Sequence, residues 1–373
     1  MMDKNGATVL AYLNENCKHI FTKIFSGKRI SAEECLTLYN EASLSALGFA
    51  ANYMCEQKNK RFVYFNKNIH IEPTNICIHN CVFCSYARKK NQEGSWELSV
   101  DEIVHNISAN CTDSITEFHI VGGVHPERKL DFYVELLTAL KLSYPKVHIK
   151  AFTAVEIEFM AIASRCSFKE ALAALKNAGL DSMPGGGAEI FDTDLRKKIC
   201  PSKTNAENWL TIHETAHNLN IPTTATMLYG HIESYEHRVS HLLRLRNLQD
   251  KTGGFHAFIP LKYKKENNPL GLSTEVSWVE VLRNFAVSRI FLDNFNHIKA
   301  YWPMIGKDLA QISLDFGVDD FDGTINDSTK IYSMAGADDT NPSMTQEQMV
   351  ALIKEARKVP VERDSVYNTI SIF

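Results

Sequence analysis

From residue 68 onward the chain alternates short apolar or β-branched runs with longer amphipathic stretches. This alternation is typical of repeated βα units, in which a crossover helix follows each parallel strand. Stretches such as 130–144 and 205–220 have apolar residues at helical spacing between the runs. The candidate strands are 68–74, 116–122, 146–152, 181–184, 223–229, 255–261, 297–302 and 317–323. The pattern therefore predicts an α/β fold, a TIM-type (β/α)8 barrel.

The predicted barrel has an extension at each end. Residues 1–60 carry apolar positions at helical intervals, and Ser31 with the acidic residues after it resembles a helix N-cap. We expect a helical N-terminal extension over 1–60, the barrel over 61–340, and a helical C-terminal tail over 341–373 that packs on the barrel. In such a barrel the active site lies at the C-terminal ends of the strands.

The charge of the chain narrows the class of partner. The 40 Lys and Arg residues against 44 Asp and Glu give a formal charge of −4, and no basic block stands out. We therefore expect a small-molecule substrate, with neither nucleic acid nor a membrane as partner. Residues 1–21 lack the apolar core of a signal peptide, and no apolar run approaches the length of a membrane span. We expect a cytoplasmic protein whose cysteines stay reduced.

Three cysteines are clustered directly after the first predicted strand. Cys77, Cys81 and Cys84 form a C-x3-C-x2-C motif, although chance would place only roughly 0.005 such triplets in the chain. A loop with three thiolates leaves one iron of an iron-sulfur cluster open to another ligand. The alternative is a zinc site, but structural zinc takes four ligands, and only His79 lies within the loop to complete the set.

This motif, with the aromatic Tyr86 two positions after its last cysteine, resembles the radical S-adenosylmethionine (SAM) superfamily. The resemblance covers residues 68 to about 340. It implies a [4Fe-4S] cluster on Cys77, Cys81 and Cys84, with SAM on the open iron and Tyr86 among the cofactor-binding residues. One electron then cleaves SAM to methionine and a 5'-deoxyadenosyl radical. The electron donor implied is a protein such as flavodoxin or ferredoxin.

Other strand ends resemble the SAM contacts of that superfamily. Gly122 and Gly123, after the second strand, resemble the glycine pair that binds the SAM amino group. Glu189, after the fourth strand, resembles the carboxylate that binds the SAM ribose. Gly230 and Glu233, after the fifth strand, resemble the stretch that contacts adenine. The alternative for each is an ordinary turn glycine or a solvated acid.

Several longer strings are similar to the aminodeoxyfutalosine synthases of the futalosine route to menaquinone. They are HIEPTNIC, HIVGGVHPE, HIKAFTAVEIEFM, SMPGGGAEIF, TTATMLYGHIES and NHIKAYWPMIG. The resemblance implies a transferase that adds the 5'-deoxyadenosyl group of SAM to the vinyl carbon of 3-[(1-carboxyvinyl)oxy]benzoate. Loss of the carboxyl group then gives 6-amino-6-deoxyfutalosine. Dehypoxanthine futalosine cyclase and a non-catalytic Fe-S or zinc-binding barrel remain alternatives.

A substrate with two carboxylates requires cations or hydrogen-bond donors at the barrel mouth. We expect His125 and Glu156, at strand ends, to be the catalytic residues. Further candidates, each with an equally good structural interpretation, are His148, Lys150, Thr153, Arg88, Lys299, His70 and Glu72.

Overall fold

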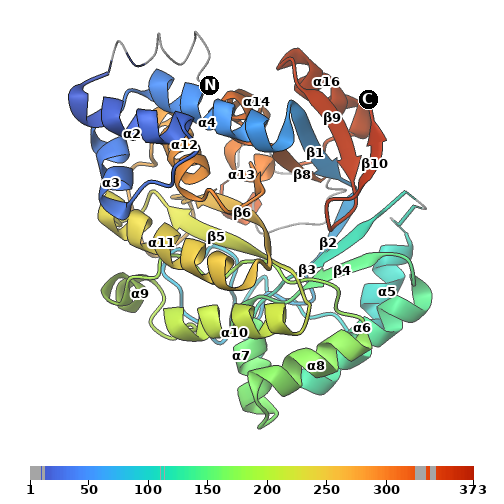
Figure 1. Ribbon diagram of the computed structural model, residues 1–373. Helices are drawn as coiled ribbons and strands as arrows, with labels where there is room; N and C mark the ends of the chain where they lie inside the picture. Colours follow the sequence, from blue (N-terminus) through green and yellow to red (C-terminus); the bar gives the residue numbers. More distant parts are fainter. Residues whose placement is uncertain (1–9, 11–12, 110, 113, 324–332, 337–341) are drawn as a thin grey trace.

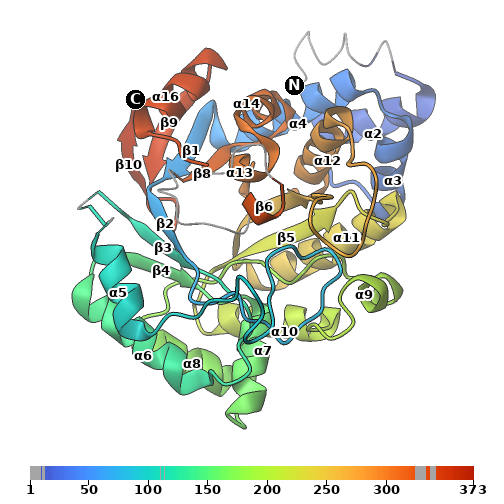
Figure 2. The ribbon, with the colours of Figure 1, turned by 180° about the vertical axis from the view of Figure 1, so that it is seen from behind.

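The computed structural model describes residues 10, 13–109, 111–112, 114–323, 333–336 and 342–373. Most strands lie around the middle of the molecule and most helices lie outside them, whereas the C-terminal strand pair lies at one edge (Figure 1), as the opposite view also shows (Figure 2). The strands are β1 (Phe62–Asn66), β2 (Asn68–Ile71), β3 (Glu117–Ile120), β4 (His148–Ala151), β5 (Thr223–Tyr229), β6 (Phe255–Lys262), β7 (His297–Ile298), β8 (Asp320–Gly323), β9 (Val359–Arg363) and β10 (Thr369–Ile372).

Most of the helices follow the strands in alternation. Those before and between the strands are α2 (Glu15–Phe25), α3 (Ala32–Glu41), α4 (Leu44–Asn59), α5 (Val100–Ser108), α6 (Leu130–Ser143), α7 (Ala154–Ala163), α8 (Phe168–Ala178), α9 (Thr193–Ile199), α10 (Ala206–Asn218), α11 (Tyr235–Thr252) and α12 (Trp278–Phe291). The later ones are α13 (Trp302–Ile305), α14 (Lys307–Ser313), the 3-10 helix η1 (Leu314–Phe316) and α16 (Gln346–Glu355).

Parallel pairing connects the strands in sequence order. β2, β3 and β4 form one sheet and β5, β6 and β7 another, while β8 joins β1, β9 and β10. Isolated parallel bridges link these sheets, because Ser182 pairs with Lys150, Met183 pairs with Thr223, and Lys299 pairs with Asp320. The series therefore runs from β2 to β8 without a break in its parallel order.

Closure of this series into a barrel depends on the pairing between its first and last strands, β2 and β8. Residues 62–71 pair with β8 through β1 and with β3 through β2. The described residues include no backbone bridge between β8 and β2 themselves. The parallel α/β arrangement is confirmed, whereas the closed (β/α)8 barrel stays a prediction.

The eight predicted strand regions all take part in this pairing, but only the fifth and sixth reach their predicted length. Two of the others form the shortest pairings. The fourth region contributes only the bridges of Ser182 and Met183, and the seventh region contributes the two-residue β7. The expected helices over 130–144 and 205–220 are confirmed as α6 and α10. The predicted N-cap of α3 is confirmed, because the Ser31 hydroxyl accepts a hydrogen bond from the Glu34 N–H at 3.2 Å.

The prediction of a purely helical tail over 341–373 was wrong. After α16 the chain forms β9, which pairs in parallel with β1, and β10, which returns antiparallel to β9. β1 was not predicted as a strand, so the partner that draws β9 into a sheet was missing from the sequence interpretation. A strand at this position needs that distant partner, whereas the helix before it needs only local contacts.

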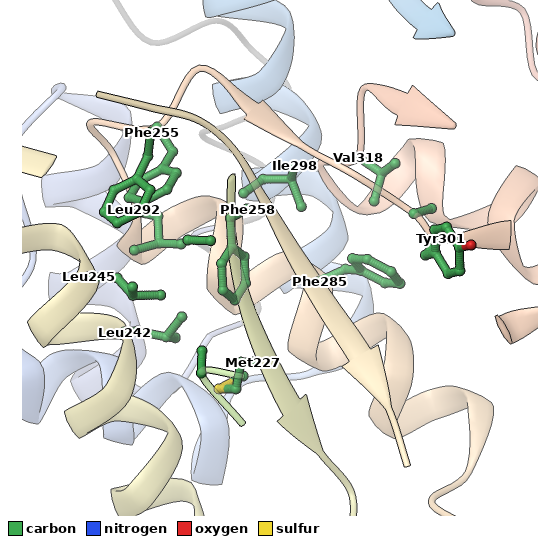
Figure 3. Close-up of a cluster of buried hydrophobic side chains, with 14 of the residues drawn as sticks. Met227, Leu242, Leu245, Phe255, Phe258, Phe285, Leu292, Ile298, Tyr301 and Val318 are labelled. Carbon is green, nitrogen blue, oxygen red and sulfur yellow. The ribbon is translucent and has the colours of Figure 1, made fainter. Parts of the chain in front are cut away.

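A large apolar core packs against the strands. Figure 3 shows Met227 of β5 near Leu242 and Leu245 of α11, and Phe258 of β6 near Ile298 of β7. All five side chains are fully buried. Burial of each such side chain stabilises the fold by about 1.5–3 kcal/mol, so the strand ends project from a well-packed scaffold. None of the described helices is both long and apolar enough to span a bilayer.

Candidate active site

The cysteine loop follows β2 and borders one cavity with all three of its thiols. Cys77, Cys81 and Cys84 are free and half-buried, and each contributes to the cavity wall. Burial raises the pKa of the Cys81 thiol to about 12, which the nearby Lys203 ammonium partly offsets. Such a thiol is protonated at neutral pH and would lose its proton on binding a metal.

Lys89 braces the backbone of this loop. Its Nζ donates to the carbonyl oxygens of Cys77 at 2.9 Å, Ile78 at 3.2 Å and His79 at 3.4 Å. The Val82 N–H donates to the Ile199 carbonyl at 2.9 Å, which ties the loop to α9. The loop is therefore held by contacts that do not involve its thiols.

The cavity has a volume of about 300 Å³ and lies at the C-terminal ends of the strands. This size falls within the range of small-molecule sites. The predicted site residues on its wall are Cys77, Cys81, Cys84, Tyr86, Gly122, Gly123 and Glu189. The fold therefore brings most of the cofactor-binding residues predicted from the sequence to one cavity.

Gly122 and Gly123 lie where β3 ends, against the backbone of the cysteine loop. A Cβ on Gly123 would lie 2.3 Å from the Ile76 carbonyl oxygen, and one on Gly122 would lie 2.9 Å from the Thr74 carbonyl oxygen. The Gly123 N–H donates to Thr74 O at 2.7 Å. The absence of side chains therefore lets this turn pack directly on the loop, in addition to lining the cavity.

Glu189 does not project freely into the cavity as a solvated acid would. It forms an ion pair with Lys203 at 2.5 Å, and both side chains are largely buried in the wall. The Lys203 ammonium lies 5.4 Å from the ring centroid of Phe83, a cysteine-loop residue. No local signal in the sequence reveals the burial of Lys203, since its partner Glu189 lies 14 positions earlier.

Tyr86 is buried beneath the cysteine loop. Its hydroxyl donates to the Thr74 carbonyl oxygen at 3.2 Å, and its ring packs edge-on against Trp96. Burial raises the pKa of this phenol well above its usual range. The side chain therefore supports the loop and also contributes to the cavity wall.

Gly230 and Glu233 are not on the cavity wall. The Glu233 carboxylate accepts hydrogen bonds from the N–H groups of Gly230 at 2.6 Å and His231 at 2.8 Å. It also pairs with Arg238 at 2.8 Å. These contacts make Glu233 a buried anchor for the turn after β5, and they use the carboxylate oxygens locally.

His125 and Glu156, the expected catalytic residues, also lie off the wall. The His125 Nδ1 accepts from the Glu127 N–H at 3.1 Å, and its Nε2 lies 3.0 Å from the Glu97 carboxylate. Glu156 accepts from the Thr153 N–H at 2.7 Å and from its hydroxyl at 2.8 Å, as the capping box of α7. It also accepts a backbone hydrogen bond from Gly122, and burial raises its pKa to about 7. Glu156 therefore holds the cavity-lining residues Thr153 and Gly122 in place without facing the cavity, whereas the partners of His125 are not on the wall.

The floor of the cavity is polar and charged. Lys150 pairs with Glu117 at 2.5 Å, and Lys299 pairs with Asp322 at 2.5 Å. Lys150, Asp322 and His119 border the cavity. His119 and Asp322 were not predicted as site residues, although His119 is the register partner of the candidate Lys150 and so lies on the same face of the sheet.

The described residues contain no set of three or more His, Cys, Asp or Glu that is close enough to hold a single metal ion. A [4Fe-4S] cluster is wider than one ion, because each of its cysteines binds a different iron. Three thiols spread around one side of a cavity therefore fit a cluster with an open iron.

Two family models match the chain. Residues 71–245 match the model described as the radical SAM superfamily, and residues 252–372 match that of the CofH/MqnC C-terminal region. The second match includes β9 and β10, so the C-terminal strands lie within the region that this family model describes.

Curated relatives resemble the chain over nearly its full length. An aminodeoxyfutalosine synthase from Thermus thermophilus is 45% identical over 358 residues, which cover 95% of this chain and 96% of the relative. A cyclic dehypoxanthine futalosine synthase from Streptomyces coelicolor is 36% identical over 357 residues, covering 95% of this chain and 88% of the relative.

Among solved structures, the crystal structure of methylornithine synthase (PylB) superposes with a TM-score of 0.71. The match covers 90% of this chain and 94% of that chain at 16% identity. At this identity the likeness shows the fold, which is a TIM-like α/β fold.

Proposed function

The chain belongs to the radical SAM superfamily and is a radical SAM transferase; on that premise we propose that it is an aminodeoxyfutalosine synthase. Its substrate would be 3-[(1-carboxyvinyl)oxy]benzoate, which receives the 5'-deoxyadenosyl group of SAM and loses the carboxyl group of its carboxyvinyl unit, while the ring carboxylate is kept. The product, 6-amino-6-deoxyfutalosine, belongs to menaquinone biosynthesis. The observation that carries the proposal is that Cys77, Cys81 and Cys84 open on the same cavity as the charged floor of Lys150 and Asp322.

Cys77, Cys81 and Cys84 would hold the [4Fe-4S] cluster, since all three are free and face the cavity. When bound, the cluster would supply the electron that cleaves SAM, and SAM would supply the adenosyl group. Flavodoxin or ferredoxin would be the electron donor. Gly122, Gly123 and Glu189 would contact SAM.

The protein's own residues would hold the reactants in place and exclude water. Lys89 fixes the cysteine loop, and Glu156 fixes the turn of Gly122 through its hydrogen bonds to Thr153 and Gly122. Glu189 would accept hydrogen bonds from the ribose hydroxyls while Lys203 holds its carboxylate in position. Such fixed geometry favours bond formation at one carbon over quenching of a reactive radical by other hydrogen donors.

A closed barrel would support this geometry. We propose that residues 61–340 form a closed (β/α)8 barrel after a helical extension over 1–60. Closure would run through residues 62–71, which pair with β8 at one end and with β3 at the other.

The second candidate is the cyclase that uses dehypoxanthine futalosine, because a relative of that kind is 36% identical. The higher identity to the synthase, 45%, favours the first candidate. Membership of the superfamily favours either enzyme over a non-catalytic metal-binding barrel.

Product identification separates the two enzymes. The anaerobically reconstituted protein is incubated with SAM, a one-electron reductant and one candidate substrate at a time, and the products are analysed by mass spectrometry. The proposal expects 6-amino-6-deoxyfutalosine from 3-[(1-carboxyvinyl)oxy]benzoate and no cyclised product from dehypoxanthine futalosine. The reverse result would replace the synthase by the cyclase.

A further inference from the structure

Two polar side chains lie next to each other on the cavity floor. His119 of β3 and Lys150 of β4 are register partners in a parallel pair, so their side chains project to the same side of the sheet. Both border the cavity. On the other side of His119, its register partner is His70 of β2, and the two imidazole centroids are 4.6 Å apart.

Among the described residues, both side chains have hydrogen-bonding groups that no protein partner uses. An ammonium has three donors, and within the described part of the chain Lys150 uses one of them, toward Glu117 at 2.5 Å. The Nδ1 of His119 is buried and has no hydrogen-bond partner among the described residues. Burial and the Lys150 charge hold the pKa of His119 well below its usual range, so the ring is neutral and carries one N–H donor.

Charged groups of both signs surround Lys150 and His119 at the cavity floor. Lys150 with Glu117 and Lys299 with Asp322 form two buried ion pairs, and all four side chains are largely inaccessible to solvent. Asp322 has a positive φ of 67°, an uncommon conformation for a residue with a side chain, and its Oδ2 has no hydrogen-bond partner in the described residues. A buried carboxylate oxygen in this position repels an anion placed beside it.

We propose that Lys150 and His119 form a carboxylate-binding subsite, which takes the ring carboxylate of a 3-substituted benzoate. The assignment to a benzoate rests on the proposed function. Lys150 donates to one carboxylate oxygen through its unused hydrogens, and His119 donates to the other. Asp322 acts as a specificity residue, since its repulsion directs the carboxylate to the β3 and β4 side of the floor.

The subsite is tested with 3-methoxybenzoate and its uncharged analogue 3-methoxybenzamide as probes. Binding to the reconstituted holoenzyme is measured by calorimetry under anaerobic conditions, with SAM present and no reductant. The double variant Glu117→Gln/Lys150→Met removes both charges of one ion pair and avoids leaving a buried carboxylate unpaired. It should bind the benzoate about 10- to 100-fold more weakly, as expected for a lost charge-assisted hydrogen bond. Its affinity for the benzamide should change by less than about 2-fold.

Two further variants separate binding from a structural role. Asp322→Asn should bind the benzoate more tightly than the wild type does, whereas a merely structural Asp322 predicts weaker binding. The double variant Glu275→Gln/Lys262→Met is the matched control, because Lys262 also forms a buried ion pair, with Glu275 at 2.6 Å, and neither residue is on the cavity wall. Its affinity for both probes should equal that of the wild type.

The proposal is overturned if the wild type does not bind 3-methoxybenzoate, or if the double variant loses both probes equally or neither. Failure of the proposed function gives a different pattern. In that case the benzoate preference depends on Lys150 as described, yet no coupled nucleoside forms from 3-[(1-carboxyvinyl)oxy]benzoate.

Discussion

Glu156 should make the protein less stable as the pH rises through the range from its ordinary pKa to its pKa in the fold. The carboxyl has an ordinary value of 4.5, and burial raises its pKa to about 7 in the folded protein. Below the lower value both states are protonated, and the group has no effect on stability. Between the two values the unfolded chain is ionised while the folded protein keeps its proton, so stability falls. Above the upper value the full penalty remains, about 3 kcal/mol at roughly 1.36 kcal/mol for each pKa unit.

Glu156→Gln removes this penalty and keeps the local structure. An amide oxygen still accepts hydrogen bonds from Thr153, and Gln is found at this position of capping boxes. We expect the variant to exceed the wild type in stability by about 1–3 kcal/mol at pH 8, since weaker hydrogen bonds offset part of the gain. At about pH 5 the difference should fall below about 1 kcal/mol. Urea unfolding followed by circular dichroism measures both values.

Glu170→Gln provides the matched control. Glu170 occupies the same capping-box position in α8, but it is exposed, and its hydrogen bonds with Ser167 lower its pKa. Its contribution is therefore present above the ordinary pKa and is lost as the pH falls, which is the opposite sign to that of Glu156. A stability gain of Glu156→Gln that is equal at both pH values, or a more stable wild type at pH 8, would refute the reasoning.

Two predictions concern the cofactors. Replacing Cys77, Cys81 or Cys84 singly by Ala should abolish SAM cleavage with an unchanged circular dichroism spectrum, because Lys89 and the backbone contacts still hold the loop; full activity in any one variant contradicts the cluster assignment. Glu189→Ala should weaken SAM binding more than Glu189→Gln does, since each lost hydrogen bond is worth about 0.5–1.5 kcal/mol. Unchanged SAM affinity of both variants in an anaerobic titration would exclude the ribose contact.

The strands of the fold were largely predictable, because apolar runs of the right length recur between helical stretches. The exceptions have physical reasons. Residues 181–184 form only isolated bridges, so their short apolar run marked the position but not the regularity of the strand. β1 and β9 pair with each other across nearly the whole chain, and such a pairing leaves no local pattern to find.

The site residues were predictable where they belong to a local sequence motif. They were less predictable where their position depends on burial against distant parts of the chain. The cysteine spacing and the glycine pair indicated the cavity correctly. Glu156 belongs to a T-x-x-E capping box that is visible in the sequence. This motif explains its observed position at the start of α7, whereas the expected catalytic role would place it on the cavity wall. Lys203 is placed by its ion pair with Glu189, and Asp322 has an unusual backbone conformation with a positive φ. The sequence alone reveals neither feature.

The fate of the adenosyl group tests the proposed function most directly. Wild-type protein, reconstituted anaerobically and reduced, is given 3-[(1-carboxyvinyl)oxy]benzoate and SAM labelled in its adenosyl moiety. If the protein is the synthase, mass spectrometry will find the label in a nucleoside that carries the benzoate ring. Label recovered only as free 5'-deoxyadenosine would contradict the synthase assignment and leave the superfamily membership intact.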